Sequence, residues 1–237
     1  MKEIIAIHGW CGDSKIWEPW KKYFELNGWS WKNANRGYGA IPPINPNWSK
    51  SKSDTSQKRL LICHSLGSHL IDEKTLSNAT SIILLSSFSQ FIPDSKESRH
   101  LKKALEGMKR SLGTFNEKAM LKSFLSKVYL PHTTIPITHA QIVNEITTQG
   151  RAKLIDDLEL LINTNGLPNS FPIKAEVLSI YGEEDSIVPK SSNNLLIKAL
   201  KKHLHTQPTF WAISKEGHSL FISSILKQVA NWIQVSL

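Results

Sequence analysis

Short runs of apolar residues alternate along this chain with stretches in which apolar residues recur every three or four positions. Continuous apolar runs end at Ile7, Cys63 and Leu85, and two further runs cover residues 177–181 and 210–213. Short continuous runs of this kind are typical of strands that are buried on both faces of a parallel sheet. Their alternation with helical stretches predicts an α/β protein built on a mostly parallel, doubly wound sheet.

The middle of the chain departs from this alternation. Residues 90–172 contain no convincing strand, and their apolar residues form four stripes at helical spacing. The stripes lie in residues 101–112, 121–128, 140–146 and 154–162. We therefore expect a single domain, in which residues 1–87 and 173–237 form the sheet with its helices and residues 88–172 form a helical lid.

Two local patterns predict where helices begin and how far they run. Thr114, followed by Glu117 three residues later, matches a capping box ahead of the second lid stripe. Residues 66–76 lie between two predicted strands, and the stretch can form a single crossover helix.

The sequence Cys63-His64-Ser65-Leu66-Gly67 stands between a predicted buried strand and a predicted helix. A serine at such a strand-to-helix turn takes strained backbone angles and projects its hydroxyl above the sheet, provided that the residues two positions away are small. Gly67 meets this requirement, and the small Cys63 stands where a glycine is usual. Ser65 is therefore a candidate nucleophile. The alternative is that Ser65 only caps the following helix.

An acid and a histidine follow two later strands. Asp185 comes just after residues 177–181, and His218 follows residues 210–213. Because the carboxyl ends of parallel strands meet at one edge of a sheet, both side chains can reach the edge at which Ser65 is expected. The chain order Ser, Asp, His is that of a catalytic triad on such a sheet. Taken singly, each residue also has a structural interpretation, the acid in a turn and the histidine at a helix N-terminus.

Backbone N–H groups near Ser65 complete a candidate site for acyl transfer, a reaction that needs donors aimed at the developing oxyanion. The N–H of Leu66, directly after the serine, supplies one donor, and that of Trp10, in the loop after the first strand, supplies another. The helix that begins at Leu66 adds its positive end. His8, in the same loop as Trp10, is interpreted as a structural hydrogen-bonding residue.

The composition excludes several classes of protein. With 12 Gly, 11 Pro and 2 Cys in 237 residues, the chain is no collagen, low-complexity segment or disulfide scaffold. No apolar run approaches the roughly 18 residues that a membrane span needs, and the first residues do not resemble a signal peptide. Two cysteines without a pairing pattern point to a reducing compartment. We expect a cytoplasmic, monomeric protein that does not contact a membrane.

Positive charge is concentrated in the first half of the lid. The chain carries 29 Lys and Arg against 20 Asp and Glu, a formal net charge of +9. Residues 96–127 alone contain nine basic and three acidic side chains. Phe115 and Phe124 are the only aromatic residues in this segment, which argues against a base-stacking surface for nucleic acid. An acidic protein partner and a merely solvated helical face are both open.

The remaining histidines and cysteines offer no cofactor site. His132 with His139, and His203 with His205, lack companion ligands for a metal. Cys63 is interpreted as a packed, inert thiol because no base is patterned to serve it. We therefore expect neither a metal nor an organic cofactor.

These features together resemble the α/β-hydrolase superfamily over nearly the whole chain. Besides the triad, Asn35-Arg36-Gly37-Tyr38-Gly39 is similar to the superfamily's Asp-x-x-Gly-x-Gly loop, with asparagine in place of the acid. The first strands of larger members are missing, since the His8-Gly9 turn comes early. The resemblance implies an α/β-hydrolase fold with a helical lid, in which Ser65 attacks an ester carbonyl, His218 acts as base and then acid, and Asp185 holds the imidazole.

A closer resemblance is to the pimeloyl-[acyl-carrier protein] methyl ester esterases of biotin synthesis. It rests on residues 181–189 and 217–223, on His8-Gly9-Trp10 with Ser65-Leu66-Gly67, and on a four-helix lid of similar length. Within the lid, Phe124-Leu125 resembles the Phe-Leu pair that lines the family's acyl tunnel. The resemblance implies three substrate-contacting residues: Trp10, Leu66 and Phe124.

The implied activity is hydrolysis of the methyl ester of pimeloyl-acyl-carrier protein through an acyl-serine, with release of methanol. The family's lid arginines, which hold the acidic carrier protein, do not align one for one, and this chain offers Lys118, Lys122 and Lys127 nearby. Two alternatives stay open. One is another serine hydrolase on the same fold, such as a small-ester esterase, a thioesterase or a carbon–carbon bond hydrolase. The other is a receptor that binds a ligand in the same pocket.

Overall fold

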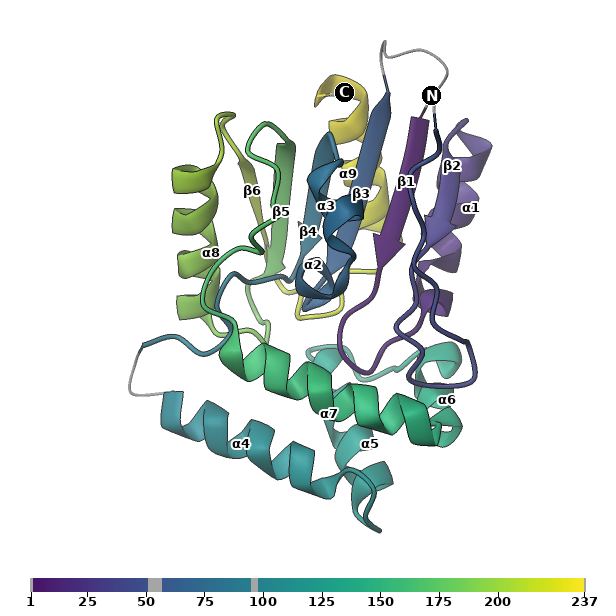
Figure 1. Cartoon of the computed structure of the whole chain (residues 1–237), viewed down its shortest axis with the longest axis vertical. Helices are drawn as coiled ribbons and strands as arrows, with labels where there is room; N and C mark the ends of the chain where they lie inside the picture. Colours follow the sequence, from purple (N-terminus) through teal and green to yellow (C-terminus); the bar gives the residue numbers. More distant parts are fainter. Residues whose placement is uncertain (1, 51–56, 95–97, 237) are drawn as a thin grey trace.

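A six-stranded sheet forms the centre of the molecule in the computed structural model, which describes residues 2–50, 57–94 and 98–236 (Figure 1). The strand order is β2-β1-β3-β4-β5-β6, and every neighbouring pair is parallel. The strands are β1 (Lys2–Ile7), β2 (Ser30–Asn33), β3 (Lys58–His64), β4 (Ser81–Leu85), β5 (Glu176–Gly182) and β6 (Thr209–Ile213). The prediction of a parallel α/β sheet is confirmed.

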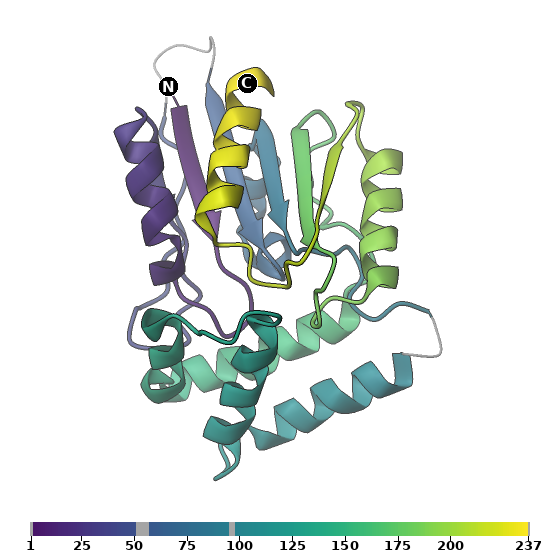
Figure 2. The ribbon, with the colours of Figure 1, turned by 180° about the vertical axis from the view of Figure 1, so that it is seen from behind.

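Helices cover both faces of this sheet, so the fold is doubly wound (Figures 1 and 2). One face carries the 3-10 turn η1 (Ser14–Trp17), α1 (Glu18–Leu26) and α9 (Ser223–Ser236). The other carries α2 (Gly67–Leu70), α3 (Glu73–Ser77) and α8 (Lys190–His203). Successive strand residues divide between the faces: Ile4 packs in the cluster of Trp20, whereas Ile5 packs in that of Leu196. This two-sided burial is the reason that the strands are continuous apolar runs.

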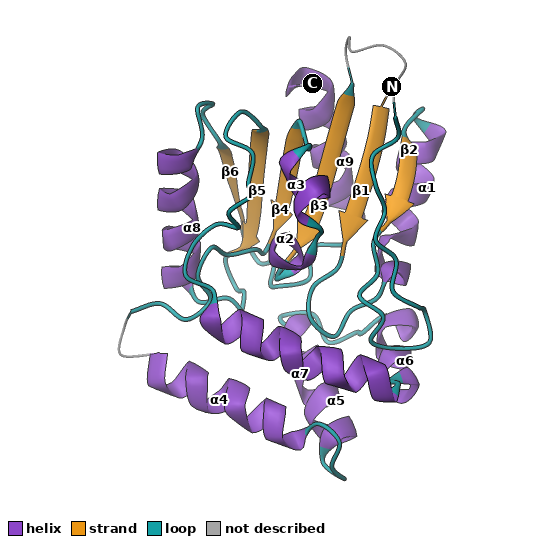
Figure 3. Ribbon diagram, in the orientation of Figure 1, coloured by secondary structure: helices purple, strands orange, loops and turns teal. Residues whose placement is uncertain are grey.

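Between β4 and β5 the elements of the described chain are all helices. They are α4 (Ser98–Ser111), α5 (Glu117–Val128), α6 (Ile137–Glu145) and α7 (Thr148–Asn163). We call these four helices the helical layer. Figure 3 shows them together beyond the carboxyl ends of the strands. Their apolar faces form a third cluster, which includes Trp10 and Leu66 from loops at that edge of the sheet. The helical layer therefore covers the edge at which the candidate site was expected.

The prediction of one crossover helix over residues 66–76 is wrong. The segment forms two short helices, because Ile71 takes an extended conformation (ψ 147°) that ends α2. Asp72 then begins a new helix, and its side chain accepts hydrogen bonds from the first backbone N–H groups of α3. A second helix therefore begins at Glu73, directly after this N-cap.

The capping box at Thr114 is not formed. The N-cap of α5 is Asn116, without a side-chain capping bond. The carboxylate of Glu117 instead accepts from the N–H of Gly113 (2.6 Å) and pairs with the guanidinium of Arg151 on α7. A tertiary ion pair thus replaces the local bond that the sequence pattern predicted.

Candidate active site

Ser65 lies at the turn between β3 and α2. Its φ of 54° falls in the left-handed region, which residues other than glycine rarely occupy and which is common at functional sites. The N–H of Ser65 donates to the carbonyl of Leu85 in β4 (2.8 Å), so the turn is fastened to the sheet. The N-cap position of α2 belongs to Leu66. Ser65 therefore does not cap the helix, and its strained turn presents the hydroxyl at the sheet edge.

Small residues make this turn possible. A Cβ on Gly67 would lie 3.0 Å from Ile7 Cγ2 and 3.1 Å from the Ile7 carbonyl oxygen. A Cβ on Gly9 would lie 2.8 Å from the Cβ of Ser65. Cys63, in place of the usual first glycine, is fully buried in the apolar cluster behind the turn. Burial raises the pKa of the Cys63 thiol, which therefore stays protonated and unreactive.

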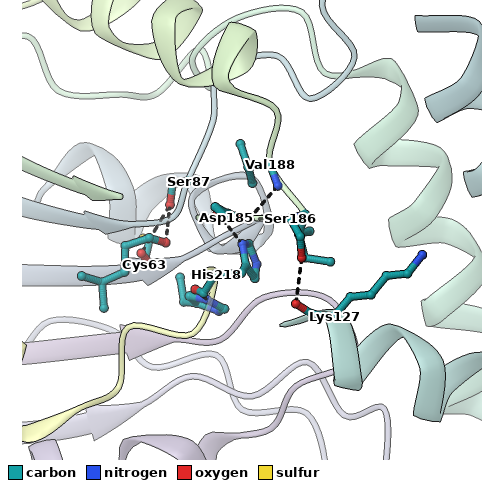
Figure 4. A network of polar contacts seen from close by, with 10 residues as sticks. Cys63, Ser87, Lys127, Asp185, Ser186, Val188 and His218 are labelled. Atoms are coloured by element: carbon teal, nitrogen blue, oxygen red, sulfur yellow. Dashed lines mark hydrogen bonds and ion pairs between the residues drawn. The ribbon is translucent and has the colours of Figure 1, made fainter. Parts of the chain in front are cut away.

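Asp185 and His218 form a buried pair (Figure 4). Asp185 Oδ2 lies 2.9 Å from His218 Nδ1, and both side chains are 2% exposed. The other carboxylate oxygen accepts from the backbone N–H groups of Ile187 (2.8 Å) and Val188 (3.0 Å). The carboxylate is thereby fixed in position, and it holds the proton of the imidazole on Nδ1. That tautomer leaves Nε2 free to act as a base.

Ser65 and His218 line the same small cavity, together with Trp10 and Phe124. Among the hydrogen bonds of the described residues, none joins the Ser65 hydroxyl to His218. Contacts between a nucleophile and its base are often long without substrate and tighten in the complex. The structure thus brings the three predicted triad members to one place, with Asp185 and His218 already in contact.

The predicted oxyanion donors are open. Neither the N–H of Trp10 nor that of Leu66 donates to a backbone acceptor in the described chain. The Trp10 indole Nε1–H donates to the carbonyl of Leu154 on α7 (2.9 Å), and its ring meets the ring of Phe124 edge-on at 4.9 Å. The helical layer thus fixes the residue whose backbone is expected to bind the oxyanion.

A cavity of about 490 Å³ adjoins Ser65. Apolar side chains of α4, α5 and α7 make most of its wall, among them Leu105, Met108, Met120, Phe124 and Leu158. Trp10 and the exposed Lys127 also line it. The volume lies within the range of small-molecule sites, and the apolar wall suits the hydrocarbon part of an acyl group.

His64 was given no role from the sequence, although it stands directly before Ser65. Its Nε2 lies 3.1 Å from the carbonyl oxygen of His218, and the two rings are 4.8 Å apart. Burial holds the pKa of His64 well below its usual value, so the ring is neutral and donates one hydrogen bond. His64 supports the backbone of the histidine loop from the strand that carries the nucleophile.

The end of α5 contacts the loops that carry Asp185 and His218. The hydroxyl of Ser186 donates to the carbonyl of Lys127 (3.0 Å), as Figure 4 shows. The N–H of Ser219 donates to the carbonyl of Val128 (3.1 Å). Sequence reasoning did not find these contacts, because backbone carbonyls at a helix end leave no mark in the residue pattern.

The predicted carrier-docking lysines lie on the exposed side of α5. Lys118, Lys122 and Lys127 are all exposed, and none makes an ion pair with a described residue. Lys118 and Lys122 are one helical turn apart and share a face. Lys96, counted with the same basic segment, lies outside the described residues.

Neither a cluster of metal ligands nor a membrane-spanning helix is present in the ranges that the structure describes. They contain no group of three or more His, Cys, Asp or Glu side chains that is arranged to hold a metal ion. Their helices are too short or too polar to cross a membrane.

His8, in the loop after β1, has a structural role. It bonds to the Gly9 carbonyl through Nδ1 (2.8 Å) and accepts from the N–H of Arg36 (3.1 Å).

The sequence matches no protein-family model and no curated protein. Solved structures do share the fold. An esterase from Exiguobacterium antarcticum has a TM-score of 0.73 at 15% identity, over 99% of this chain and 92% of its own. A bromoperoxidase from Bacillus anthracis has a TM-score of 0.70 at 16% identity, over 99% and 90%. A bottromycin epimerase has a TM-score of 0.64 at 11% identity, over 100% and 90%.

This chain therefore has the α/β-hydrolase fold. An esterase, a bromoperoxidase and an epimerase are among the proteins that share it, so the fold alone does not decide the reaction. The reaction depends on the groups at the site.

Proposed function

We propose that this protein is a serine ester hydrolase that acts through Ser65, His218 and Asp185. The observation that carries the proposal is the buried 2.9 Å contact between Asp185 and His218 at the edge where Ser65 occupies a strained turn. A serine with a left-handed φ, an imidazole oriented by a carboxylate and two open backbone donors form the set of groups that acyl transfer requires.

In the proposed reaction, His218 Nε2 takes the proton of the Ser65 hydroxyl as Oγ attacks the ester carbonyl carbon. The N–H groups of Trp10 and Leu66 stabilise the negative charge on the carbonyl oxygen. The C–O bond to the leaving alcohol then breaks, and the alkoxide takes the proton from His218. A water molecule, deprotonated by His218, attacks the acyl-serine and releases the carboxylic acid and free Ser65.

The cavity next to Ser65 favours an ester with an apolar acyl chain. Its volume of about 490 Å³ and its Leu, Met and Phe wall provide a site for hydrocarbon, with Phe124 across from Trp10. The methyl ester of a pimeloyl group fits this description. We therefore propose the pimeloyl-acyl-carrier protein methyl ester as the specific substrate, with methanol as the leaving alcohol.

An acidic carrier protein would dock against the basic side of the helical layer. Lys118 and Lys122 are exposed, have no acidic partner among the described residues and lie on the helix that also lines the acyl cavity. Complementary charge of this kind increases the rate of encounter and sets the orientation of the partner. The proposed reaction needs no metal or organic cofactor. As a step of biotin synthesis, it would take place in the cytoplasm.

Labelling with a fluorophosphonate tests the proposed chemistry, because the reagent phosphonylates an activated serine. Mass spectrometry of the digested protein should find the adduct on Ser65. Ser65→Ala should remove the adduct and lower hydrolysis of a short p-nitrophenyl ester by roughly 10³-fold or more while the protein stays folded. Ser126→Ala, at an exposed serine of α5, is the matched control and should keep both properties.

Three outcomes separate the proposal from its alternatives. An adduct on Ser65 with hydrolysis of p-nitrophenyl esters supports an esterase. An adduct together with preferential hydrolysis of thioesters would favour a thioesterase. No adduct and no turnover by the folded protein would overturn the enzyme proposal and favour a binding protein that uses the same cavity.

A further inference from the structure

Three histidines line the small cavity beside Ser65, and one of them, His139, has no role in the proposed reaction. His139 lies on α6, is 4% exposed, and lines the same small cavity as Ser65, His64 and His218. Its Nε2 is buried and has no hydrogen-bond partner. A buried polar atom without a partner is costly, which indicates that a molecule in the cavity completes its bonding.

The other ring nitrogen of His139 has a defined partner. The Tyr129 hydroxyl lies 2.7 Å from His139 Nδ1. Burial raises the pKa of Tyr129 to about 12, so its hydroxyl keeps its proton and is a donor. The Tyr129 hydroxyl therefore donates to Nδ1. This arrangement places the ring proton of His139 on Nε2, the atom without a partner.

His139 is a neutral donor at physiological pH. Burial lowers its pKa to about 4, although an interaction with the Cys11 backbone carbonyl acts in the opposite direction. That carbonyl does not have the geometry of a hydrogen bond to Nε2. The other two imidazoles at the cavity are already occupied: His64 Nε2 contacts the His218 carbonyl, and His218 Nδ1 contacts Asp185. His139 Nε2–H is therefore an uncommitted N–H donor among the imidazoles of this cavity.

The size and position of the cavity indicate what it holds. Its volume is about 10 Å³, which is close to the smallest space that holds a single water molecule. The acyl chain has its own, larger cavity between α4, α5 and α7. Leu66, whose N–H is an expected oxyanion donor, does not line the small cavity, whereas His218 does. The small cavity thus lies on the side of the base and not at both oxyanion donors.

We propose that His139 is a positioning residue that holds the hydrolytic water beside Ser65 and His218. The inference rests on the proposed esterase function and concerns its second step. The water oxygen accepts the hydrogen bond from His139 Nε2–H, and one water proton passes to His218 Nε2. The oxygen bonds to the acyl carbon, the bond from that carbon to Ser65 Oγ breaks, and Oγ takes the proton from His218.

Separate measurement of the two steps tests the proposal. Stopped-flow release of p-nitrophenol from p-nitrophenyl acetate gives the acylation rate constant, and mass spectrometry of quenched samples gives the decay of the acyl-enzyme. His139→Leu should slow the decay about tenfold, which corresponds to the loss of one neutral hydrogen bond, and should leave acylation unchanged. The steady-state signature is a parallel fall in kcat and KM at constant kcat/KM.

Two further variants separate positioning from packing. His139→Gln retains an amide N–H near the place of Nε2 and should restore most of the deacylation rate. His203→Leu removes a half-buried histidine of α8, which bonds to the Phe171 carbonyl (2.8 Å), and should change stability without changing either step. Thermal unfolding of all three variants shows whether each is folded.

The outcomes distinguish this inference from the proposed function. If the wild type forms a fluorophosphonate adduct but His139→Leu slows acylation and deacylation equally, His139 contributes to the oxyanion site or to packing, and the water-positioning role is overturned. Unchanged deacylation in His139→Leu would also overturn it. If the wild type forms neither an adduct nor an acyl-enzyme, the esterase proposal fails, and this inference fails with it.

Discussion

Three acidic residues stand next to one another after β5, and only one of them contacts His218. Glu183 and Glu184 are exposed, whereas the side chain of Asp185 is 2% exposed and lies against His218. We expect Asp185→Asn to lower kcat/KM on p-nitrophenyl acetate by about 10²–10⁴-fold, because an amide at this position favours the wrong imidazole tautomer. Glu184→Gln keeps the same volume and neutralises a neighbouring charge, so it should cost less than about twofold. Equal losses in the two variants would contradict the assignment of the acid.

Buried histidines should make the stability of this protein sensitive to mild acid. Burial lowers the pKa of both His8 and His139 from 6.5 to about 4. In the unfolded chain each ring binds a proton near pH 6.5, but in the folded protein it does not until about pH 4. Their contribution is therefore fully present above pH 6.5 and is lost as the pH falls towards 4.

Urea unfolding at pH 8, 6.5 and 5 measures this effect. Each histidine should cost about 2 kcal/mol of unfolding free energy between pH 8 and pH 5, an interval in which most carboxylates stay ionised. His139→Gln should remove the contribution of one histidine, about 2 kcal/mol, from that pH dependence. A free energy that is the same at pH 8 and pH 5 would show that these rings titrate normally in the folded protein.

The sheet was predictable because its strands are buried on both faces. A short continuous apolar run such as residues 82–85 is typical of a central parallel strand, and β4 occupies Ser81–Leu85. The boundaries within the crossover and at α5 were not predictable from spacing. In the crossover, Ile71 is extended and Asp72 caps a new helix. At α5, the ion pair of Glu117 with Arg151 on α7 takes the place of the predicted capping box.

In the candidate site, too, some residues were predictable from the sequence and others were not. The structure places Ser65, Asp185 and His218 together, and each of them carries a local signal, a strand end followed by a turn. His64 and His139 carry no such signal. His139 reaches the cavity only because α6 packs beside η1 at the sheet edge, so its role depends on a contact between segments far apart in the sequence.

The loop that carries His218 depends on close contact with the end of α5. A Cβ on Gly217 would lie 1.7 Å from the carbonyl oxygen of Leu130, which is backbone and cannot turn away as a side chain can. We expect Gly217→Ala to lower the free energy of unfolding by about 1–3 kcal/mol through overpacking. It should also lower kcat/KM by up to about 10²-fold, because displacement of the loop moves His218.

A second glycine provides the control for this substitution. Nothing lies within 4 Å of the position that a Cβ would take on Gly166. Gly166→Ala should therefore leave activity unchanged and alter stability by less than about 1 kcal/mol. Urea unfolding and ester hydrolysis of both variants form the test. If Gly217→Ala behaved like Gly166→Ala, the contact between the end of α5 and the loop of His218 would matter neither for stability nor for activity.

Charge is distributed unevenly over the molecule. Reversal of the charges on one side can therefore distinguish an esterase specific for a carrier protein from a general esterase. Exposed basic residues gather on the outer sides of α4 and α5: Arg99, Lys102, Lys103, Arg110, Lys118 and Lys122. Lys109, in contrast, is paired with Glu159 (2.6 Å) and so is partly neutralised. An acidic partner would gain most from the lysines of α5, because the same helix lines the acyl cavity.

Reversal of Lys118 and Lys122 to Glu should therefore raise the KM for a methyl ester presented on acyl-carrier protein, by about tenfold at low salt. The rate on a small uncharged ester should hardly change, because the triad is untouched. Added salt should reduce the difference between wild type and variant, since exposed charges are screened over a Debye length of about 8 Å at physiological ionic strength. Lys198→Glu with Lys202→Glu is the matched control: this pair is also exposed and four residues apart, but it lies on α8. Steady-state kinetics on both substrates decides the matter. If the α5 and α8 reversals raise KM equally, only the net charge matters, and if neither does, the basic side of the helical layer is not the docking surface.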